Sequence, residues 1–119
     1  MAVNVQEIAD QIFQGMKGEL KEFKDDELLS AKARAKAMAA VIADAAEQLA
    51  LGNLSKAEAE QMIQLNADAA AAGLEADLGI VALRANSAIK AGLKIVVDVA
   101  LGAAGLGWLG PIVNSALLP

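Results

Sequence analysis

The sequence predicts an all-α fold, an elongated helical hairpin or bundle of three to five helices with an apolar, Gly/Ala-rich C-terminal helix. Three observations lead to this prediction. Strong helix formers, above all Ala, Leu, Glu, Lys, Gln and Met, dominate the chain, and both prolines lie late, at positions 111 and 119. Apolar residues recur at spacings of three and four, which is the period of one helix face. No stretch of useful length alternates apolar and polar residues as a strand does.

The first helix is expected over residues 4–24. Asn4, followed three residues later by Glu7, matches a capping box at its start. Gly15 and Gly18 lie inside it, where each glycine weakens a helix by roughly 1 kcal/mol relative to Ala, unless it lets a neighbouring helix approach closely. One apolar stripe runs along this helix and consists of Val5, Ile8, Ile12, Met16, Leu20 and Phe23.

A second helix is expected over residues 26–51, with Asp25 or Asp26 as its cap. Its apolar positions alternate spacings of three and four without a slip, which is the pattern of a heptad seam. Several of these positions hold alanine, so the backbone of a partner helix can come near. The partner is either another helix of the same chain or a helix of a second copy. This 28–49 stripe consists of Leu28, Ala31, Ala35, Met38, Ile42, Ala45 and Leu49.

Turn and cap residues predict where the third helix begins. Gly52 or Asn53 can take the left-handed position that ends the second helix. Ser55 with Glu58 is a capping box, the most specific local signal in the chain. A third helix is therefore expected to begin at residue 55.

The apolar stripe changes phase by two positions near Gly73. The stripe before it consists of Met62, Leu65, Ala69, Ala72 and Ala76, and a second stripe begins at Leu74. We therefore expect a break or kink between residues 72 and 79, which gives helices over 55–72 and 74–98.

The chain divides into a charged region, residues 1–98, and an apolar segment, residues 99–119. Of the twenty-five charged residues, eighteen lie in 1–61 and seven in 62–119, and none lies in the twenty residues 99–118, called here the C-terminal segment. Its length suits a bilayer, yet Pro111, Asn114, Ser115 and its glycines make insertion of one isolated copy marginal. We interpret it first as an association surface and second as a membrane element.

The association interface is predicted from small and apolar residues of two regions. In the C-terminal segment, small side chains spaced four apart favour tight helix–helix contact. The predicted contact residues are Ala31, Ala35, Met38, Ile42, Ala45 and Leu49 of the 28–49 stripe, with Gly102, Gly105, Leu106, Gly107, Trp108 and Leu109. Asp98 stands in an apolar run, four residues after Lys94. The two form either an ion pair at the edge of the apolar region or, in the sharper interpretation, a charge near a lumen or membrane boundary.

The composition argues against an enzyme. The chain has no His, Cys, Tyr or Thr, which removes imidazole catalysis, thiolate chemistry and the usual zinc ligands. We predict no catalytic residue, no metal site and no cofactor. The net charge of −5 and the three aromatic residues argue against a nucleic-acid partner. The basic run Lys32, Arg34 and Lys36 is interpreted as a solvated helix face.

The leading hypothesis is a structural protein that binds other copies of itself through the C-terminal segment. The first alternative is a membrane-inserting pore component, whose general character resembles ejected internal proteins of tailed phages or pore-forming toxins. The second is a helical adaptor whose 28–49 stripe binds a partner helix. The N-terminal residues lack a basic stretch followed by an apolar core, so cytosolic synthesis without a signal peptide is expected, with a membrane or a virion as a further destination.

Overall fold

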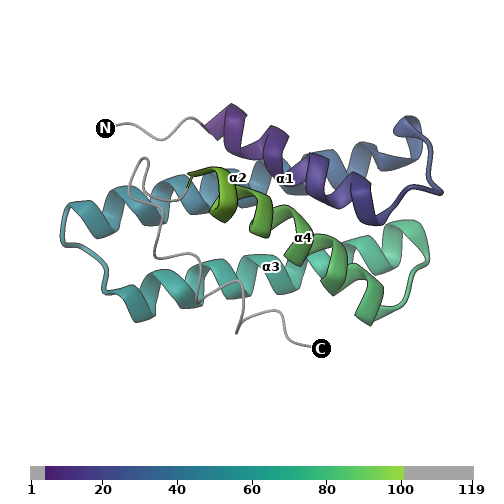
Figure 1. Ribbon diagram of the computed structural model, residues 1–119. Coiled ribbons are helices and arrows are strands. Elements are labelled where there is room, and N and C mark those ends of the chain that lie inside the picture. Colours follow the sequence, from purple (N-terminus) through teal and green to yellow (C-terminus); the bar gives the residue numbers. More distant parts are fainter. Residues whose placement is uncertain (1–4, 101–119) are drawn as a thin grey trace.

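The computed structural model describes the backbone of residues 5–100 and the side chains of residues 5–95. Within that range the chain is all-helical, which confirms the predicted class, and four α-helices form a bundle (Figure 1). The elements are α1 (Val5–Glu19), the short 3-10 helix η1 (Asp25–Leu28), α2 (Leu29–Ala50), α3 (Lys56–Leu78) and α4 (Ala82–Ala100).

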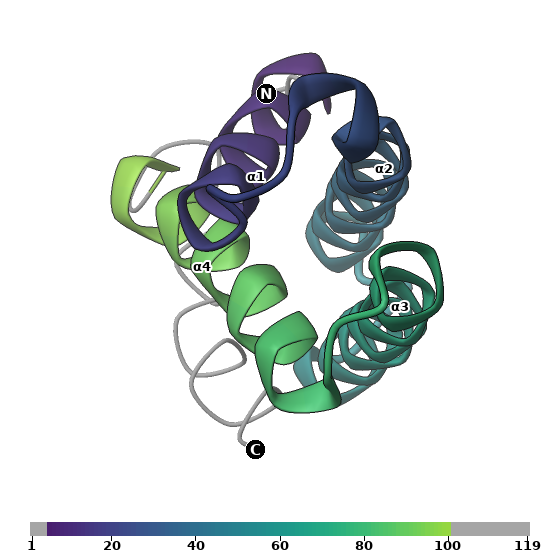
Figure 2. The same cartoon turned by 90° about the vertical axis from the view of Figure 1, so that its right-hand side faces the viewer.

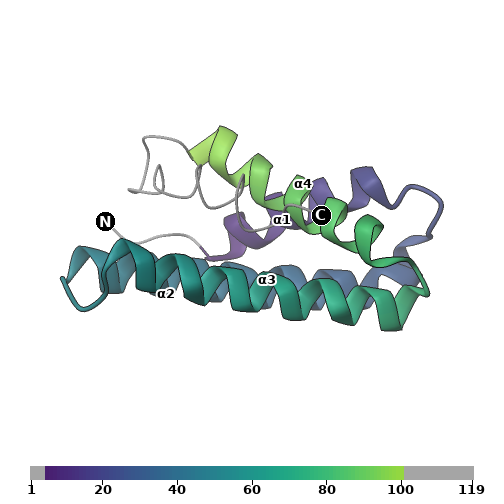
Figure 3. The same ribbon diagram turned by 90° about the horizontal axis from the view of Figure 1, so that it is seen from below.

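Consecutive helices run in opposite directions and close a ring of four. Helix α1 contacts α2, α2 contacts α3, α3 contacts α4, and α4 returns to α1. Figure 2 shows the pair α1 and α4 facing the pair α2 and α3, and Figure 3 shows α2 and α3 lying together as one layer. The bundle is elongated, with extents of 41 × 25 × 19 Å, as the sequence predicts.

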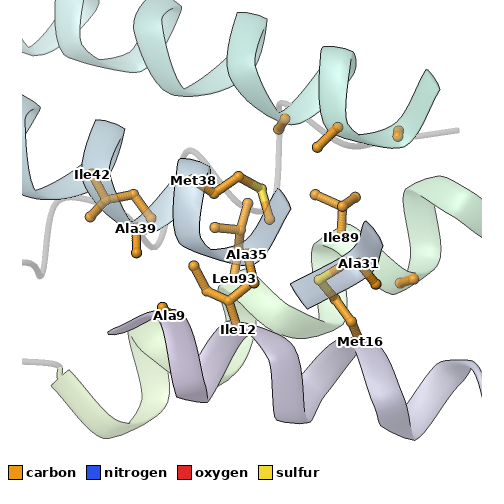
Figure 4. Close-up of a cluster of buried hydrophobic side chains, with 14 of the residues drawn as sticks. Ala9, Ile12, Met16, Ala31, Ala35, Met38, Ala39, Ile42, Ile89 and Leu93 are labelled. Carbon is orange, nitrogen blue, oxygen red and sulfur yellow. The ribbon is translucent and has the colours of Figure 1, made fainter. Parts of the chain in front are cut away.

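The core is a single apolar cluster to which all four helices contribute (Figure 4). No polar or charged residue is buried in the part of the chain described. Fully burying a large apolar side chain stabilises a fold by about 1.5–3 kcal/mol. Alanines separate the large side chains and let the helices approach. The largest fully buried side chains are Ile12, Met16, Leu20, Leu28, Ile42, Leu74, Ile89 and Leu93.

Helix α1 buries the predicted stripe but ends earlier than residue 24. Ile12, Met16 and Leu20 are fully buried, whereas Val5, at the exposed start, is 40% exposed. After Glu19 the hydrogen bonds become those of turns, because the Leu20 N–H donates to the Lys17 carbonyl and the Phe23 N–H to the Leu20 carbonyl. The predicted extension to residue 24 is therefore wrong.

The second helical region begins at η1 rather than at a capping aspartate. Glu27 accepts a hydrogen bond from the Lys24 N–H at 2.8 Å, so it satisfies a backbone donor ahead of the first turn. The prediction that Asp25 or Asp26 caps this helix is wrong, since neither supplies that bond. Both carboxylates still lie in the first turn of η1, where the helix dipole favours negative charge.

The turn between α2 and α3 follows the sequence prediction. Gly52 is left-handed with φ +77°, and the Asn53 N–H donates to the Gln48 carbonyl in the manner of a Schellman motif. Ser55 then caps α3. Its hydroxyl accepts from the Glu58 N–H at 3.1 Å, and the Glu58 carboxylate accepts from the Ser55 N–H at 2.9 Å. The capping box is confirmed.

Helix α3 passes through Gly73 without a break, so the predicted helix bounds 55–72 and 74–98 are wrong, although the expected break between residues 72 and 79 is found at the end of that interval. The chain reverses only after Leu78, at Gly79, which adopts φ +66° and donates its N–H to the Glu75 carbonyl. The buried face is also not the stripe through Leu65, which is 62% exposed. The core face consists instead of Ala59, Ile63, Ala67, Ala70, Ala71 and Leu74.

Candidate functional site

The 28–49 stripe lies inside the chain's own bundle. Of the six residues that this stripe contributes to the predicted association interface, five are at most 2% exposed, and Leu49 is partly buried against the same core. Figure 4 shows Ala31, Ala35 and Met38 among labelled side chains of α1 and α4. The partner is therefore another helix of the same chain. Contact with a second copy or an adaptor's target through this stripe would require the bundle to open.

The remaining predicted interface residues cannot be placed in the same way. Gly102, Gly105, Leu106, Gly107, Trp108 and Leu109 lie outside the described residues. Asp98 lies in the last turns of α4, with its side chain outside the described set. Lys94 is exposed to solvent on the same helix. The pairing of Lys94 with Asp98 therefore remains a prediction.

Helices α1 and α4 come into backbone contact at two glycines, Gly15 and Gly92. A Cβ added at Gly15 would lie 2.6 Å from both the Ala91 carbonyl oxygen and the Gly92 Cα. A Cβ added at Gly92 would lie 2.7 Å from the Ile12 carbonyl oxygen. Both glycines therefore let the two backbones touch. Gly18, by contrast, has nothing within 4 Å of its added Cβ, so only Gly15 fulfils the close-approach role considered for this helix.

A polar cluster joins the start of α2 to the end of α3. Asp77 accepts hydrogen bonds from the Ser30 hydroxyl and from Arg34, whose Nη2 lies 3.0 Å from the carboxylate. The hydrogen bond from Ser30, followed by that from Arg34, lowers the pKa of Asp77 below its ordinary value. Gly73 makes room for this arrangement, because an added Cβ would overlap the Arg34 guanidinium.

A second set of contacts ties α1, η1 and α4 together at the same end of the bundle. Arg84, near the start of α4, pairs with Glu22 and donates to the Glu19 carbonyl at 3.2 Å. The hydrogen bond from Arg84 lowers the pKa of Glu22. Lys17 Nζ lies 3.4 Å from an Asp25 carboxylate oxygen. These pairs hold the loop after α1 against two helices.

These polar groups connect elements of the bundle to one another. Ser30 donates to the Asp77 carboxylate, and the ion pair of that carboxylate with Arg34 weakens it as a base for the Ser30 hydroxyl. Across residues 5–95, no group of three or more acidic side chains is placed to hold a metal ion. The carboxylates that do form pairs are solvent-accessible and bridge helices.

Sequence reasoning missed the Arg34–Asp77 and Arg84–Glu22 pairs. It placed Arg34 in a solvated basic face, although Arg34 is half-buried while Lys32 and Lys36 on the same helix are exposed. The partners are distant, 43 positions apart for Arg34 and Asp77. No local pattern carries that information. The contact follows from the antiparallel packing of α2 against α3.

Among the helices of the described part, none combines the length and the apolar character that crossing a membrane requires. The chain matches no known family, no curated protein and no solved structure.

Proposed function

We propose that the chain is a non-enzymatic helical subunit that assembles with copies of itself through its C-terminal segment. One observation carries this proposal. The described bundle already has one apolar core of its own, and α4 runs at Ala100 into a stretch without a single charge. A segment that is apolar on all sides needs cover on all sides.

The residue types of the C-terminal segment favour packing against another helix. Ala100, Ala104 and Gly107 are spaced so that a helix over these positions would carry small side chains on one face, where a partner backbone could come close. The strongly apolar residues supply the driving force, about 25 cal/mol per Å² of apolar surface removed from water. They are Val99, Leu101, Leu106, Leu109, Ile112, Val113, Leu117 and Leu118.

Light scattering after size exclusion tests the proposal on the full chain. At micromolar concentration in buffer or mild detergent, we expect a mass well above the 12.2 kDa of one chain. Gly105→Leu or Gly107→Leu should return the mass to one chain, because the larger side chain separates packed helices. Gly18→Leu is the matched control, since Gly18 is exposed with open space around it. A wild-type chain that stays at 12.2 kDa would contradict self-assembly.

A membrane pore is the second candidate, favoured by the length of the charge-free stretch. About twenty apolar residues span the hydrocarbon core of a bilayer, and residues 99–118 number twenty. Leakage of dye from anionic liposomes separates the two functions. Leakage that disappears with Gly107→Leu and changes with Asp98→Asn would favour the pore. Assembly without leakage between pH 5 and 8 would favour the purely structural function.

A further inference from the structure

The four helices group into two antiparallel pairs, each held together by a contact of its own. In the first pair, the backbones of α1 and α4 touch at Gly15 and Gly92. In the second pair, the Arg34 guanidinium of α2 occupies the space that a side chain at Gly73 of α3 would take, and it binds Asp77. Figure 2 shows the two pairs facing each other. Each pair therefore has close contacts in addition to the apolar core that the two pairs share.

Both connections between the pairs lie at one end of the bundle, called here the connected end. Residues 20–24 lead from α1 into η1 and α2, and residues 79–81 lead from α3 into α4. Figure 1 shows both on the right-hand side, whereas the turn between α2 and α3 lies on the left-hand side. The ion pair of Lys17 with Asp25, which joins α1 to η1, also lies at the connected end. Within residues 5–100, the backbone does not link the two pairs at the opposite end.

The faces that the two pairs turn towards each other are apolar. Figure 4 shows Ala35 and Met38 of the 28–49 stripe among side chains that include Ile12 of α1 and Leu93 of α4. All four residues are at most 2% exposed. Among neighbouring α-helices, the contact between α1 and α4 is the most extensive and that between α3 and α4 the least. Separation of the pairs therefore keeps the most extensive contact and breaks the least extensive one.

We propose that the bundle opens as two helix pairs hinged at the connected end, and that this opening uncovers the 28–49 stripe. The closed bundle is then an autoinhibited form, in which the chain's own α1 and α4 occupy the stripe. A hinge motion of this kind changes the backbone angles of a few loop residues and leaves the helices formed. The opening is a property of a single chain, so it does not rest on the proposed self-assembly.

Thiol modification and amide exchange, measured on the same variant, distinguish hinge opening from unfolding. The chain has no cysteine, so Ala35→Cys places a single thiol in the stripe, where the native residue is 1% exposed. Hinge opening exposes this thiol while α2 keeps its helical hydrogen bonds. The opening constant from thiol modification in buffer should therefore exceed that from exchange of the α2 amide hydrogens by at least about tenfold.

Two further variants support this measurement. Ala40→Cys, which is exposed on the same helix, supplies the reaction rate of an accessible thiol. Met38→Cys removes volume from the core instead of adding it, and it carries the test if Ala35→Cys loses helix content by circular dichroism. Equal opening constants from the two methods would mean that the stripe becomes accessible only when α2 unfolds, and they would overturn the proposal.

Distances between spin labels test where the hinge lies. Gln6→Cys with Glu47→Cys places one label on each pair, away from the connected end, and Glu47→Cys with Gln61→Cys places both labels on α2 and α3. Labelled chains are diluted with unlabelled ones, so each distance lies within one chain. In dodecyl maltoside micelles, which favour an open form by covering its apolar faces, the first distance should gain a longer population and the second should stay unchanged. An unchanged first distance would contradict the opening, and lengthening of both would show that the helices separate individually instead of in pairs.

Discussion

Gly73 makes room for the side chain of Arg34, and this role is invisible in its local sequence. The phase change of the apolar stripe predicted a break near it, between residues 72 and 79. In the folded chain, α3 continues through Gly73, whose missing side chain leaves room for the Arg34 guanidinium to reach Asp77. In the sequence, a glycine that ends a helix cannot be distinguished from a glycine that makes room for a distant side chain. Only the tertiary packing distinguishes the two roles.

The room that Gly73 leaves for Arg34 predicts different outcomes for glycine-to-alanine substitution at Gly73 and at Gly18. Gly18→Ala adds a methyl group in open space and should stabilise the fold by about 0.5–1 kcal/mol through helix propensity. Gly73→Ala should gain less, because its methyl group displaces Arg34 from Asp77. Urea unfolding followed by circular dichroism measures both. In an Arg34→Ala background the gain at Gly73 should rise, and equal gains at both glycines in the unaltered background would argue against the contact.

At the scale of elements, the sequence predicted helix boundaries well where they depend on local backbone conformation or on hydrogen bonds between side chains and nearby backbone groups. Ser55 with Glu58 and the left-handed Gly52 are local signals, and both are confirmed. The end of α1 and the start of α2 were predicted wrongly, since long-range packing of Leu20 and Leu28 into the core decides where the chain turns. The core face of α3 was missed because alanines occur on every face of that helix and leave no contrast.

The contact between α1 and α4 predicts that Gly15→Ala destabilises the bundle. The added Cβ would meet backbone atoms of Ala91 and Gly92 at 2.6 Å, and backbone cannot move aside as a side-chain tip can. Overpacking of this kind costs about 1–3 kcal/mol, which exceeds the gain in helix propensity. Urea unfolding should show a lower midpoint for Gly15→Ala and a higher one for Gly18→Ala on the same helix. A stabilised Gly15→Ala variant would mean that the two helices pack further apart.

At the scale of the molecule, the composition and the spacing of apolar residues were enough to predict the fold class. They were not enough to predict which helix packs against each apolar helix face. The all-α class and the elongated shape follow from helix formers and the three-four spacing. The 28–49 stripe was correctly recognised as a packing surface, yet the heptad pattern is the same for a partner in the chain and one in a second copy. The bundle decides this choice by burying the stripe. The polar pairs could not be predicted, because they depend on which helices become neighbours.

The same polar contacts predict that acid destabilises the whole bundle. Bonds from Arg84, from the Ser55 backbone N–H and from Ser30 lower the pKa of Glu22, Glu58 and Asp77 respectively. A carboxyl whose pKa is lower in the folded chain stabilises it above the pKa of the unfolded chain. That contribution is lost as the pH falls through the folded pKa.

The thermal midpoint should therefore decrease as the pH falls below about 5, near the ordinary pKa of carboxyl groups. The triple variant Glu22→Gln, Glu58→Gln and Asp77→Asn should start from a lower midpoint at pH 7 and lose less of it on acidification, since the three groups no longer bind protons. Asp44→Asn is the control for a changed net charge, because Asp44 is exposed on α2 and the described side chains show no ion pair to it. Its pH profile should stay parallel to that of the wild type. If the triple variant also runs parallel, the acid sensitivity arises from other groups, and these three contacts contribute little to the stability of the bundle.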